Sequence, residues 1–132
     1  DMVMEVNDKA NLIIQEFISH AAGTDIRVFL IGDKIVGAMK RKSSDGDFRA
    51  NITRGGSPQP IDLDSDAEFL AIQSSNIMNL DIAGVDLLID KEGFRICEIN
   101  SAPGFQGLEK ATGLNIAAEI VHFVEQKINL AI

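Results

Sequence analysis

Two apolar stretches, each interrupted by a short turn, constrain the fold of this 132-residue chain more than any other feature. The stretch 25–39 is divided by Gly32-Asp33, a two-residue turn of the kind that joins antiparallel strands. The stretch 82–99 is divided in the same way at residues 90–93. Short apolar runs bounded by turn residues are typical of buried strands. The sequence therefore predicts two hairpins in an antiparallel sheet.

Other segments predict further strands, loops and a short helix. Residues 12–18 are apolar and partly β-branched, which predicts another buried strand. Residues 2–11 are mixed and are expected to form a short helix or the end of one. Residues 40–63 and 100–107 contain the glycines, serines and prolines that are typical of loops.

Two later segments have the apolar spacing of helices. Ser65-x-x-Glu68 is a capping box, and it predicts a helix that ends near Asn79. Asn115 is predicted to cap a last helix. The buried faces of the two helices are expected to consist of Ala67, Leu70, Ala71, Ser74, Ile77 and Met78, and of Ile116, Ile120, Phe123, Val124 and Ile128. This order of elements predicts an α+β fold, with helices packed on an antiparallel sheet.

Composition excludes several classes of protein. Apolar residues make up 45% of the chain, and 12 basic against 20 acidic residues give a net charge of −8. This charge argues against direct binding of nucleic acid or of an anionic membrane. No apolar stretch approaches the roughly 18 residues of a membrane span.

The cysteine content and the start of the sequence bear on localisation. Cys97 is the single cysteine and cannot form an internal disulfide, so a cytoplasmic protein is expected. Cys97 lies between apolar strand residues and is interpreted as a core residue. The sequence begins at Asp1 without a visible signal peptide, and we expect further sequence before it.

Three oxygen-bearing side chains interrupt the second predicted hairpin. Asp86 lies inside an apolar run, where an unpaired carboxylate is costly. Glu98 and Asn100 are two residues apart and therefore share one face of their strand. If the two strands pair through the turn, Asp86 can lie on that face as well. Two carboxylates and an amide suit Mg²⁺, although ion pairs of Asp86 and Glu98 with nearby Lys or Arg are an open alternative.

A basic, glycine-containing segment is the second candidate. Five of the twelve basic residues lie within residues 40–54, namely Lys40, Arg41, Lys42, Arg49 and Arg54. Arginine binds phosphate oxygens bidentately, and glycine lets backbone N–H groups approach them. Arg49 and Asn51 alternate as on a strand and would point the same way. A solvated cationic loop is the alternative, but a basic loop together with a carboxylate pair favours a Mg²⁺–polyphosphate complex.

Three segments of the chain carry a family resemblance. QEFISHAAGTDIRVFLIGDKIVGAMKRKSSDGDFRANITRGG, AGVDLLID and ICEINSAPGFQGLEKATGLNIA resemble the C-terminal part of ATP-grasp carboxylate–amine ligases. The resemblance is nearest to the RimK type, which includes enzymes that add glutamate to the tail of a small-subunit ribosomal protein. GDFRANITRGG and EINSAPGFQGLEKATG are specific when they occur together, whereas EIN alone also fits D-alanine ligases.

The resemblance implies roles for individual residues. Glu16, Phe17 and Ile18 match a linker segment that holds adenine and ribose, and Asp25 matches an acid that contacts the nucleotide. Lys40 belongs to the same expected ATP-binding set. Arg49 matches an arginine at the terminal phosphate, with Asn51 and Arg54 in the same catalytic pocket. The matches to ligands of Mg²⁺ or Mn²⁺ are Asp86, Glu98 and Asn100. The segment Ser101 to Gly104 matches part of the loop near the acyl phosphate.

The implied reaction joins a carboxylate to an amine. ATP phosphorylates the carboxylate, and the amine then attacks the acyl phosphate to give an amide, ADP and phosphate. The expected partners are ATP, a glutamate donor and an acceptor carboxylate on a protein tail or a small molecule. The alternatives are a ligase for small amino-acid substrates and a non-catalytic nucleotide-binding module.

The resemblance also indicates what the chain lacks. Family members carry an N-terminal domain and a lid with a glycine-rich loop, and neither matches these residues. Residues 1–132 are thus expected to be the C-terminal half of an ATP-grasp domain. Gln106 stands where many relatives have an acidic residue, which leaves the acceptor open. Apolar surface that would face the absent half favours a homo-oligomer.

Overall fold

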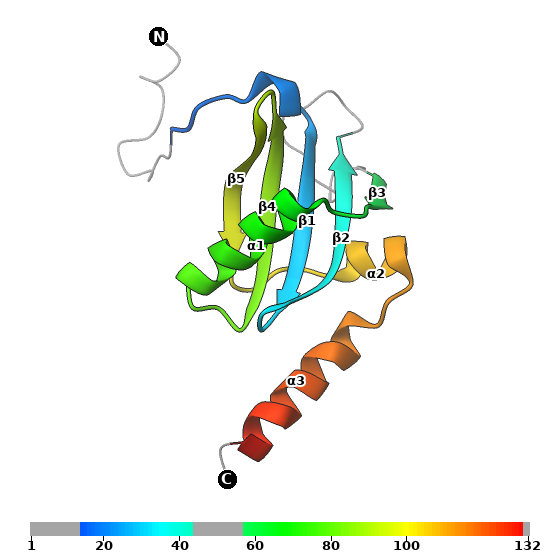
Figure 1. Ribbon diagram of the computed structural model, residues 1–132. Coiled ribbons are helices and arrows are strands. Elements are labelled where there is room, and N and C mark those ends of the chain that lie inside the picture. Colours follow the sequence, from blue (N-terminus) through cyan, green and yellow to red (C-terminus); the bar gives the residue numbers. More distant parts are fainter. Residues whose placement is uncertain (1–13, 44–56, 131–132) are drawn as a thin grey trace, which may run out of the picture.

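The computed structural model describes residues 14–43 and 57–130, and it has a mixed α+β fold built on one antiparallel sheet (Figure 1). The five strands lie in the order β3-β2-β1-β4-β5. The elements are η2 (Ser19–Ala21), β1 (Thr24–Ile31), β2 (Lys34–Lys42), β3 (Ser57–Pro60), α1 (Ser65–Ile77), β4 (Ile82–Asp90), β5 (Gly93–Asn100), α2 (Gln106–Thr112) and α3 (Ile116–Leu130). The predicted fold class is confirmed.

Both predicted hairpins are present. In the first, Ile31 of β1 pairs with Lys34 of β2 around the Gly32-Asp33 turn. In the second, Asp90 of β4 pairs with Gly93 of β5. Gly32 has φ +57° and Gly93 has φ +126°, in a region of backbone space that side chains disfavour.

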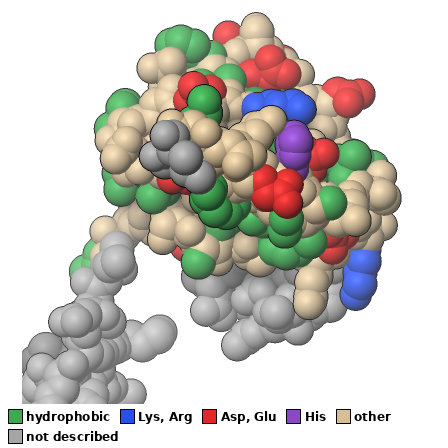
Figure 2. Space-filling model, turned by 90° about the horizontal axis from the view of Figure 1, so that it is seen from below, with side chains coloured by type: hydrophobic (Ala, Val, Ile, Leu, Met, Phe, Trp, Pro, Cys, Tyr) green, Lys and Arg blue, Asp and Glu red, His purple; other side chains and the backbone are tan. Residues whose placement is uncertain are grey.

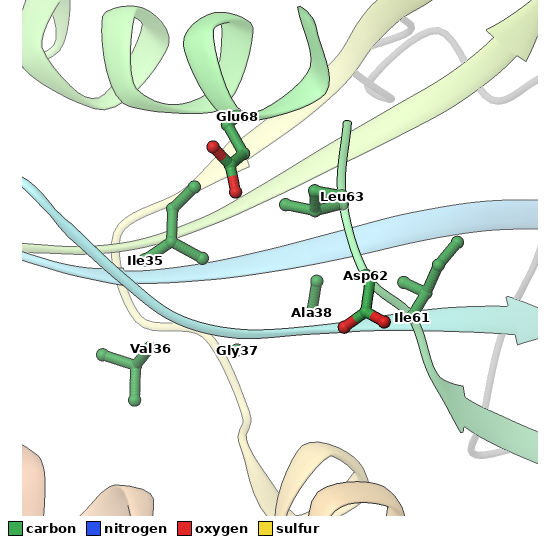
Figure 3. Close-up of a pocket in the computed structure, with 8 residues that line it drawn as sticks. All are labelled: Ile35, Val36, Gly37, Ala38, Ile61, Asp62, Leu63 and Glu68. Atoms are coloured by element: carbon green, nitrogen blue, oxygen red, sulfur yellow. The ribbon is translucent and has the colours of Figure 1, made fainter. Parts of the chain in front are cut away.

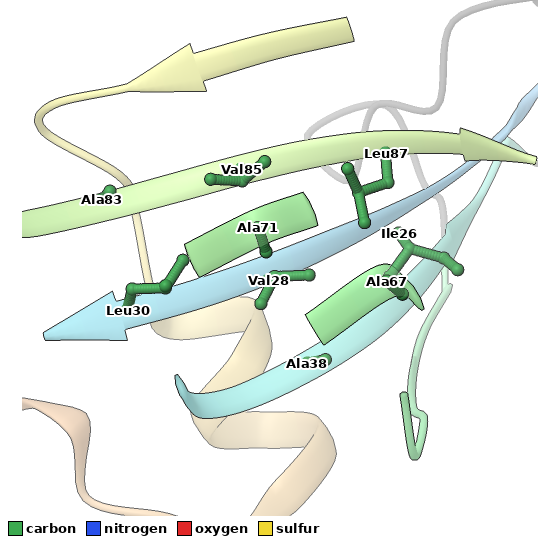
Figure 4. Packing of buried hydrophobic residues seen from close by; sticks show 9 residues of the cluster. All are labelled: Ile26, Val28, Leu30, Ala38, Ala67, Ala71, Ala83, Val85 and Leu87. Atoms are coloured by element: carbon green, nitrogen blue, oxygen red, sulfur yellow. The ribbon is translucent and has the colours of Figure 1, made fainter. Parts of the chain in front are cut away.

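One face of the sheet packs against α1. Alternate residues of the central strands point to this face, among them Val28 of β1 and Val85 of β4. They meet Ala67 and Ala71 of α1, which are fully buried (Figure 4). Small helix side chains let α1 lie close to the sheet, so this core is built from large strand residues and small helix residues.

The other face carries a second core near α2. Phe29 of β1 and Met39 of β2 pack there against Leu108 of α2 and Ile116 of α3. The Phe29 ring meets the Phe105 ring edge to face, with 6.1 Å between the centroids. The sequence did not predict α2, because its seven residues are too few to show a helical period.

The last helix, α3, begins where the sequence predicts, but fewer of its apolar side chains are buried than predicted. The Asn115 side chain accepts a hydrogen bond from the Ala118 N–H at 2.9 Å, as expected for an N-cap. Phe123 reaches the β1–β2 turn, where its ring lies 3.1 Å from the position of a Cβ on Gly32. Val124 and Ile128 are exposed, and Figure 2 shows hydrophobic and acidic side chains intermingled on the face seen from below. The predicted apolar face is thus buried only toward the start of α3.

The predicted buried strand at 12–18 is wrong over the part that the structure describes. Residues 14–18 form no strand, and Ile14 and Phe17 are 87% and 60% exposed. β1 already has β2 and β4 as its neighbours, and no described strand pairs with residues 14–18, so apolar side chains of this run are exposed. Residues 2–11, for which a helix was expected, lie outside the described residues.

Two further predictions need correction. The N-cap of α1 is Asp64 rather than Ser65, because Asp64 Oδ1 accepts a hydrogen bond from the Ala67 N–H at 2.9 Å. Ile77 and Met78 are exposed at the end of this helix, whereas Ser74 is buried as predicted and Ser75 is buried in addition.

The predicted loop at 40–63 also contains sheet. Strand β2 continues to Lys42, and Ser57–Pro60 pairs with it as β3. Pro58 and Pro60 are compatible with this strand because it is at the edge of the sheet, where a missing N–H costs no ladder bond. None of the described helices is long and apolar enough to span a membrane.

Candidate functional site

A cluster of four charged side chains crosses the three central strands. The two carboxylates belong to Asp25 of β1 and Asp86 of β4, which are 8% and 5% exposed. Arg27 donates to Asp86 through Nε and Nη2, both at 2.7 Å. Arg41 donates to Asp25 through Nε at 2.6 Å and Nη2 at 2.5 Å, and its Nη2 also reaches Asp86 Oδ2 at 2.8 Å. Each carboxylate is thus held by a guanidinium fork.

Strand register explains how these side chains meet. Asp25 lies directly opposite Arg41, and Arg27 lies directly opposite Asp86. Asp25 and Arg27 are two residues apart in β1 and point to the same face as Phe29. Arg27 was not among the predicted site residues, and Arg41 was predicted only as part of the basic segment 40–54 that was expected to bind phosphate. The alternation of charges in β1 was a signal for Arg27. Register counted from the Gly32-Asp33 turn would place Lys40 opposite Asp25, and the shift between Phe29 and Leu30 places Arg41 there instead.

Burial sets the electrostatics of the cluster. Loss of water raises the pKa of the Asp25 carboxyl above its ordinary value, and the Arg41 guanidinium only partly offsets this effect. Burial by itself would lower the pKa of Arg41, but its hydrogen bond to Asp25 and the charge of Asp86 raise it. Arg41 is therefore a permanent cation, and two guanidinium groups balance two carboxylates.

The three predicted metal ligands lie on the same face of the sheet as this cluster. Asp86 is directly opposite Glu98, and Asn100 is directly opposite Gly84, two residues from Asp86. Glu98 is exposed and Asn100 is half-buried. The Asn100 Oδ1 accepts a hydrogen bond from the Ala102 N–H at 2.9 Å.

Counting lone pairs tests whether this set fits a hard cation. A carboxylate offers about four lone-pair sites, two on each oxygen. Three N–H groups occupy Asp86, one at Oδ1 and two at Oδ2, which leaves one site on Oδ1. Residues 14–43 and 57–130 contain no group of three or more His, Cys, Asp and Glu side chains that could hold a metal. A cation here would therefore use one Asp86 oxygen, Glu98 and the Asn100 amide, and this oxygen set fits Mg²⁺ or Mn²⁺.

The alternative interpretation of Asp86 is also realised, because its carboxylate does form ion pairs with arginines. The two interpretations are compatible, since the ion pairs leave one acceptor site free. Such partners fix the orientation of a ligand and are common behind metal sites.

A bulge in β5 lies at the centre of the candidate site. The register shifts between Asp86 and Leu87. Asp86 pairs with Glu98 and Leu87 pairs with Ile96, so Cys97, which lies between them in β5, has no partner in β4. A bulge of this kind re-aims neighbouring side chains. Cys97 is exposed, so its assignment to the core is wrong. Partial burial, with added repulsion from Asp86 and other nearby carboxylates, raises the pKa of its thiol.

The loop after β5 crosses the same face. A Cβ on Gly84 would come within 2.6 Å of Pro103 and 3.6 Å of Arg27 Nε. Glycine at position 84 therefore lets the 101–104 loop lie close to β4 and beside the cluster. This is the loop that the sequence analysis expected near the acyl phosphate.

The structure does not bring all predicted site residues together. Glu16 and Phe17 are exposed and Ile18 is half-buried, in the segment before η2. Lys40 pairs with Ile26 in the ladder and lies on the α1 face, on the opposite side of the sheet from Asp25. The three residues expected at the phosphates, Arg49, Asn51 and Arg54, lie outside the described residues.

A separate pocket lies along β2 and is distinct from the cluster. It has a volume of about 240 Å³ and is lined by the 35–38 and 61–63 segments and by Glu68 of α1 (Figure 3). Asp62 and Glu68 are its charged side chains. None of the predicted site residues lines this pocket.

Solved structures share the fold of this chain at low sequence identity. The ATP-grasp ligase PsnB, solved with a phosphomimetic precursor variant, Mg and ADP, matches with a TM-score of 0.62 and 20% identity over 80% of this chain and 32% of that chain. D-alanine–D-alanine ligase from Bacillus anthracis matches with a TM-score of 0.58 and 14% identity over 82% of this chain and 41% of that chain.

Curated relatives are more similar in sequence. A probable alpha-L-glutamate ligase of Aliivibrio fischeri is 48% identical over 118 residues, which is 89% of this chain and 39% of the relative. Probable alpha-L-glutamate ligase 1 of Shewanella frigidimarina is 45% identical over 120 residues, or 91% of this chain and 40% of the relative. The chain thus spans about two fifths of the length of these relatives.

The model of the RimK-like ATP-grasp domain matches residues 1–124, which is nearly the whole chain. This match agrees with the antiparallel sheet and with the carboxylate-bearing face of β4 and β5 described above. The chain belongs to the RimK-like ATP-grasp family of ligases.

Proposed function

We propose that this chain is the C-terminal, nucleotide- and metal-binding half of an ATP-dependent ligase that joins glutamate to an acceptor carboxylate, such as a protein C-terminus. The observation that carries the proposal is the placement of Asp86 opposite Glu98, with Asn100 on the same face. The names of the relatives, probable alpha-L-glutamate ligases, support glutamate as the amine substrate.

The proposed roles follow the face of the sheet. Asp86, Glu98 and Asn100 would hold Mg²⁺ or Mn²⁺, which neutralises phosphate charge when it is bound. Asp25 would contact the nucleotide, and the segment Glu16 to Ile18 would hold its base and ribose. Lys40 lies on the opposite face and does not join this set.

The phosphate end of the site is proposed from sequence alone. Arg49 would contact the terminal phosphate, with Asn51 and Arg54 beside it, and the planar guanidinium group suits the charge that develops during transfer. The 101–104 loop, which lies beside the charged cluster, would adjoin the acyl phosphate. These groups bind and orient the reactants, which is the main demand of phosphoryl transfer.

A chimera tests the proposed function directly. Residues 1–124 would replace the matching part of the Aliivibrio fischeri relative, so that the remaining length of a glutamate ligase is supplied. Release of ADP would be measured with glutamate and a peptide acceptor, and the product would be identified by its mass. We expect glutamate-dependent ADP release and a product heavier by one glutamate residue.

Matched glutamate variants complete this test. Glu98→Gln should lower turnover by about 100-fold or more, because the removed charge balances the cation. Glu92 lies in the turn of the same hairpin, so the control variant Glu92→Gln should leave turnover unchanged. Full activity of the Glu98→Gln chimera at limiting Mg²⁺ would refute the metal assignment. ATP hydrolysis without any amide product would point to a different amine, and nucleotide binding alone would point to a non-catalytic module.

A further inference from the structure

Arg41 is the side chain that joins the two carboxylates of the buried cluster. Its Nε and Nη2 bind the two oxygens of Asp25, at 2.6 Å and 2.5 Å. The same Nη2 binds Asp86 Oδ2 at 2.8 Å. One nitrogen is therefore shared between a carboxylate of β1 and a carboxylate of β4, so a change at either carboxylate alters the hydrogen bond to the other.

Burial makes this connection stronger than a surface ion pair. Asp25, Arg41 and Asp86 are all less than 9% exposed, so water screens their charges poorly. Arg27 differs in one respect that provides a control. It holds both oxygens of Asp86 but has no hydrogen bond to Asp25 among the described residues.

We propose that Arg41 is a positioning residue that couples Asp25 to the cation ligand Asp86, so that a change at Asp25 alters cation affinity at Asp86. This inference rests on the proposed function, which makes Asp86 a metal ligand and Asp25 a nucleotide contact. Nothing in the family match assigns a role to Arg41.

The direction of the coupling follows from charge. The four side chains carry two positive and two negative charges. Asp25→Asn removes one negative charge, so the positive charge of the Arg41 guanidinium is no longer neutralised by the Asp25 carboxylate. Arg41 then interacts more strongly with Asp86, and an excess positive charge lies behind the cation site. Both effects lower the affinity for a divalent cation.

The test is a set of Mn²⁺ binding measurements on the 132-residue chain, with free Mn²⁺ detected by electron paramagnetic resonance. Asp25→Asn should weaken Mn²⁺ binding by about tenfold, as is typical when a partner of a metal ligand is removed. In an Arg41→Lys background the ammonium keeps the charge but loses the fork. There Asp25→Asn should still weaken Mn²⁺ binding through the lost charge, but by clearly less than tenfold. In an Arg27→Gln background the effect of Asp25→Asn should persist.

The outcomes separate this inference from the proposed function. An equal effect of Asp25→Asn in all three backgrounds, or no effect in any, overturns the coupling through Arg41. Mn²⁺ binding that is absent, or that survives Asp86→Asn unchanged, overturns the metal assignment and the coupling together. Circular dichroism would check the folding of each variant. If Arg41→Lys does not fold, Arg41→Gln replaces it as the background, and adding Asp25→Asn there should weaken Mn²⁺ binding less than Asp25→Asn does in the wild-type chain.

Discussion

Individual charged residues on the strands decide where chemistry can occur in this protein. A carboxylate inside an apolar strand must be paired, and Asp86 is paired with two arginines. The same pairing fixes the orientation of its carboxylate and leaves one lone-pair site on Oδ1. The observed ion pairs and the proposed role of Asp86 as a metal ligand are therefore compatible.

Cys97 provides a residue-scale test of the bulge in β5. Its thiol is exposed, so it should react with a thiol reagent such as DTNB in the folded chain. Partial burial and the nearby carboxylates raise its pKa, so the reaction should reach half its maximal rate at a higher pH than that of free cysteine. A thiol that reacts only after unfolding would contradict the bulge, and a midpoint below that of free cysteine would contradict the electrostatics.

The β4–β5 hairpin provides a pH-dependent test at the scale of the element. The Arg95 side chain and the Lys91 N–H donate to Asp90 and hold the pKa of its carboxyl below the ordinary value. This pair stabilises the hairpin above the pKa that Asp90 has in the unfolded chain, and the stabilisation is lost as pH falls through the folded pKa. Arg95→Gln should raise the Asp90 pKa in a carboxyl NMR titration. An unchanged pKa would show that the ion pair does not form in solution.

The start of α1 allows a second test at this scale. Asp64→Ala removes the side chain that accepts from the Ala67 N–H, and it should lower the free energy of unfolding by about 1 kcal/mol. Ser65→Ala is the matched control, because Ser65 is a helical residue and not the N-cap. Urea unfolding of both variants decides the question. A larger loss for Ser65→Ala would restore the capping box predicted from sequence.

The elements show what sequence patterns can and cannot predict here. Both hairpins were predictable from the two-residue period and the short turns. The shared face of Asp86, Glu98 and Asn100 was not, because register counted from the 90–93 turn places Cys97 opposite Asp86, and only the bulge in β5 brings Glu98 there. The failed prediction at 12–18 has a different cause. An apolar run favours burial, but it does not tell whether a neighbouring strand is available to pair with it, and Ile14 and Phe17 are exposed. The short helix α2 and the edge strand β3 have too few residues to show a period.

The charged cluster shows the same limit at the candidate site. Asp86 and Glu98 stood out because each interrupts an apolar run. Arg27 was missed, and Arg41 was assigned only to the basic segment expected at phosphate, whereas the structure places it against Asp25 and Asp86. Only the pairing of β1 with both β2 and β4 reveals that they face two aspartates.

At the scale of the whole molecule, the chain spans about two fifths of its curated relatives. We expect no ligase turnover from residues 1–132 alone, because the proposed C-terminal half of an ATP-grasp domain would by itself contact ATP from one side and leave it open to water. Mass spectrometry of an overnight reaction with ATP, Mg²⁺, glutamate and a peptide tests this expectation, with the full-length Aliivibrio fischeri relative run beside it. Amide product from the isolated chain would contradict the division into halves. Self-association through exposed apolar residues such as Val124 and Ile128 stays a prediction, which sedimentation velocity can test.

The central claim is that Asp86, Glu98 and Asn100 form one divalent-cation site. The most direct measurement is the Mn²⁺ dissociation constant of the 132-residue chain in the presence of ADP, compared with that of single variants. We predict that Asp86→Asn, Glu98→Gln and Asn100→Ala each weaken Mn²⁺ binding by about tenfold or more, whereas Glu92→Gln in the same hairpin leaves it unchanged. Equal Mn²⁺ affinity of the wild-type chain and the Glu98→Gln variant would contradict the claim.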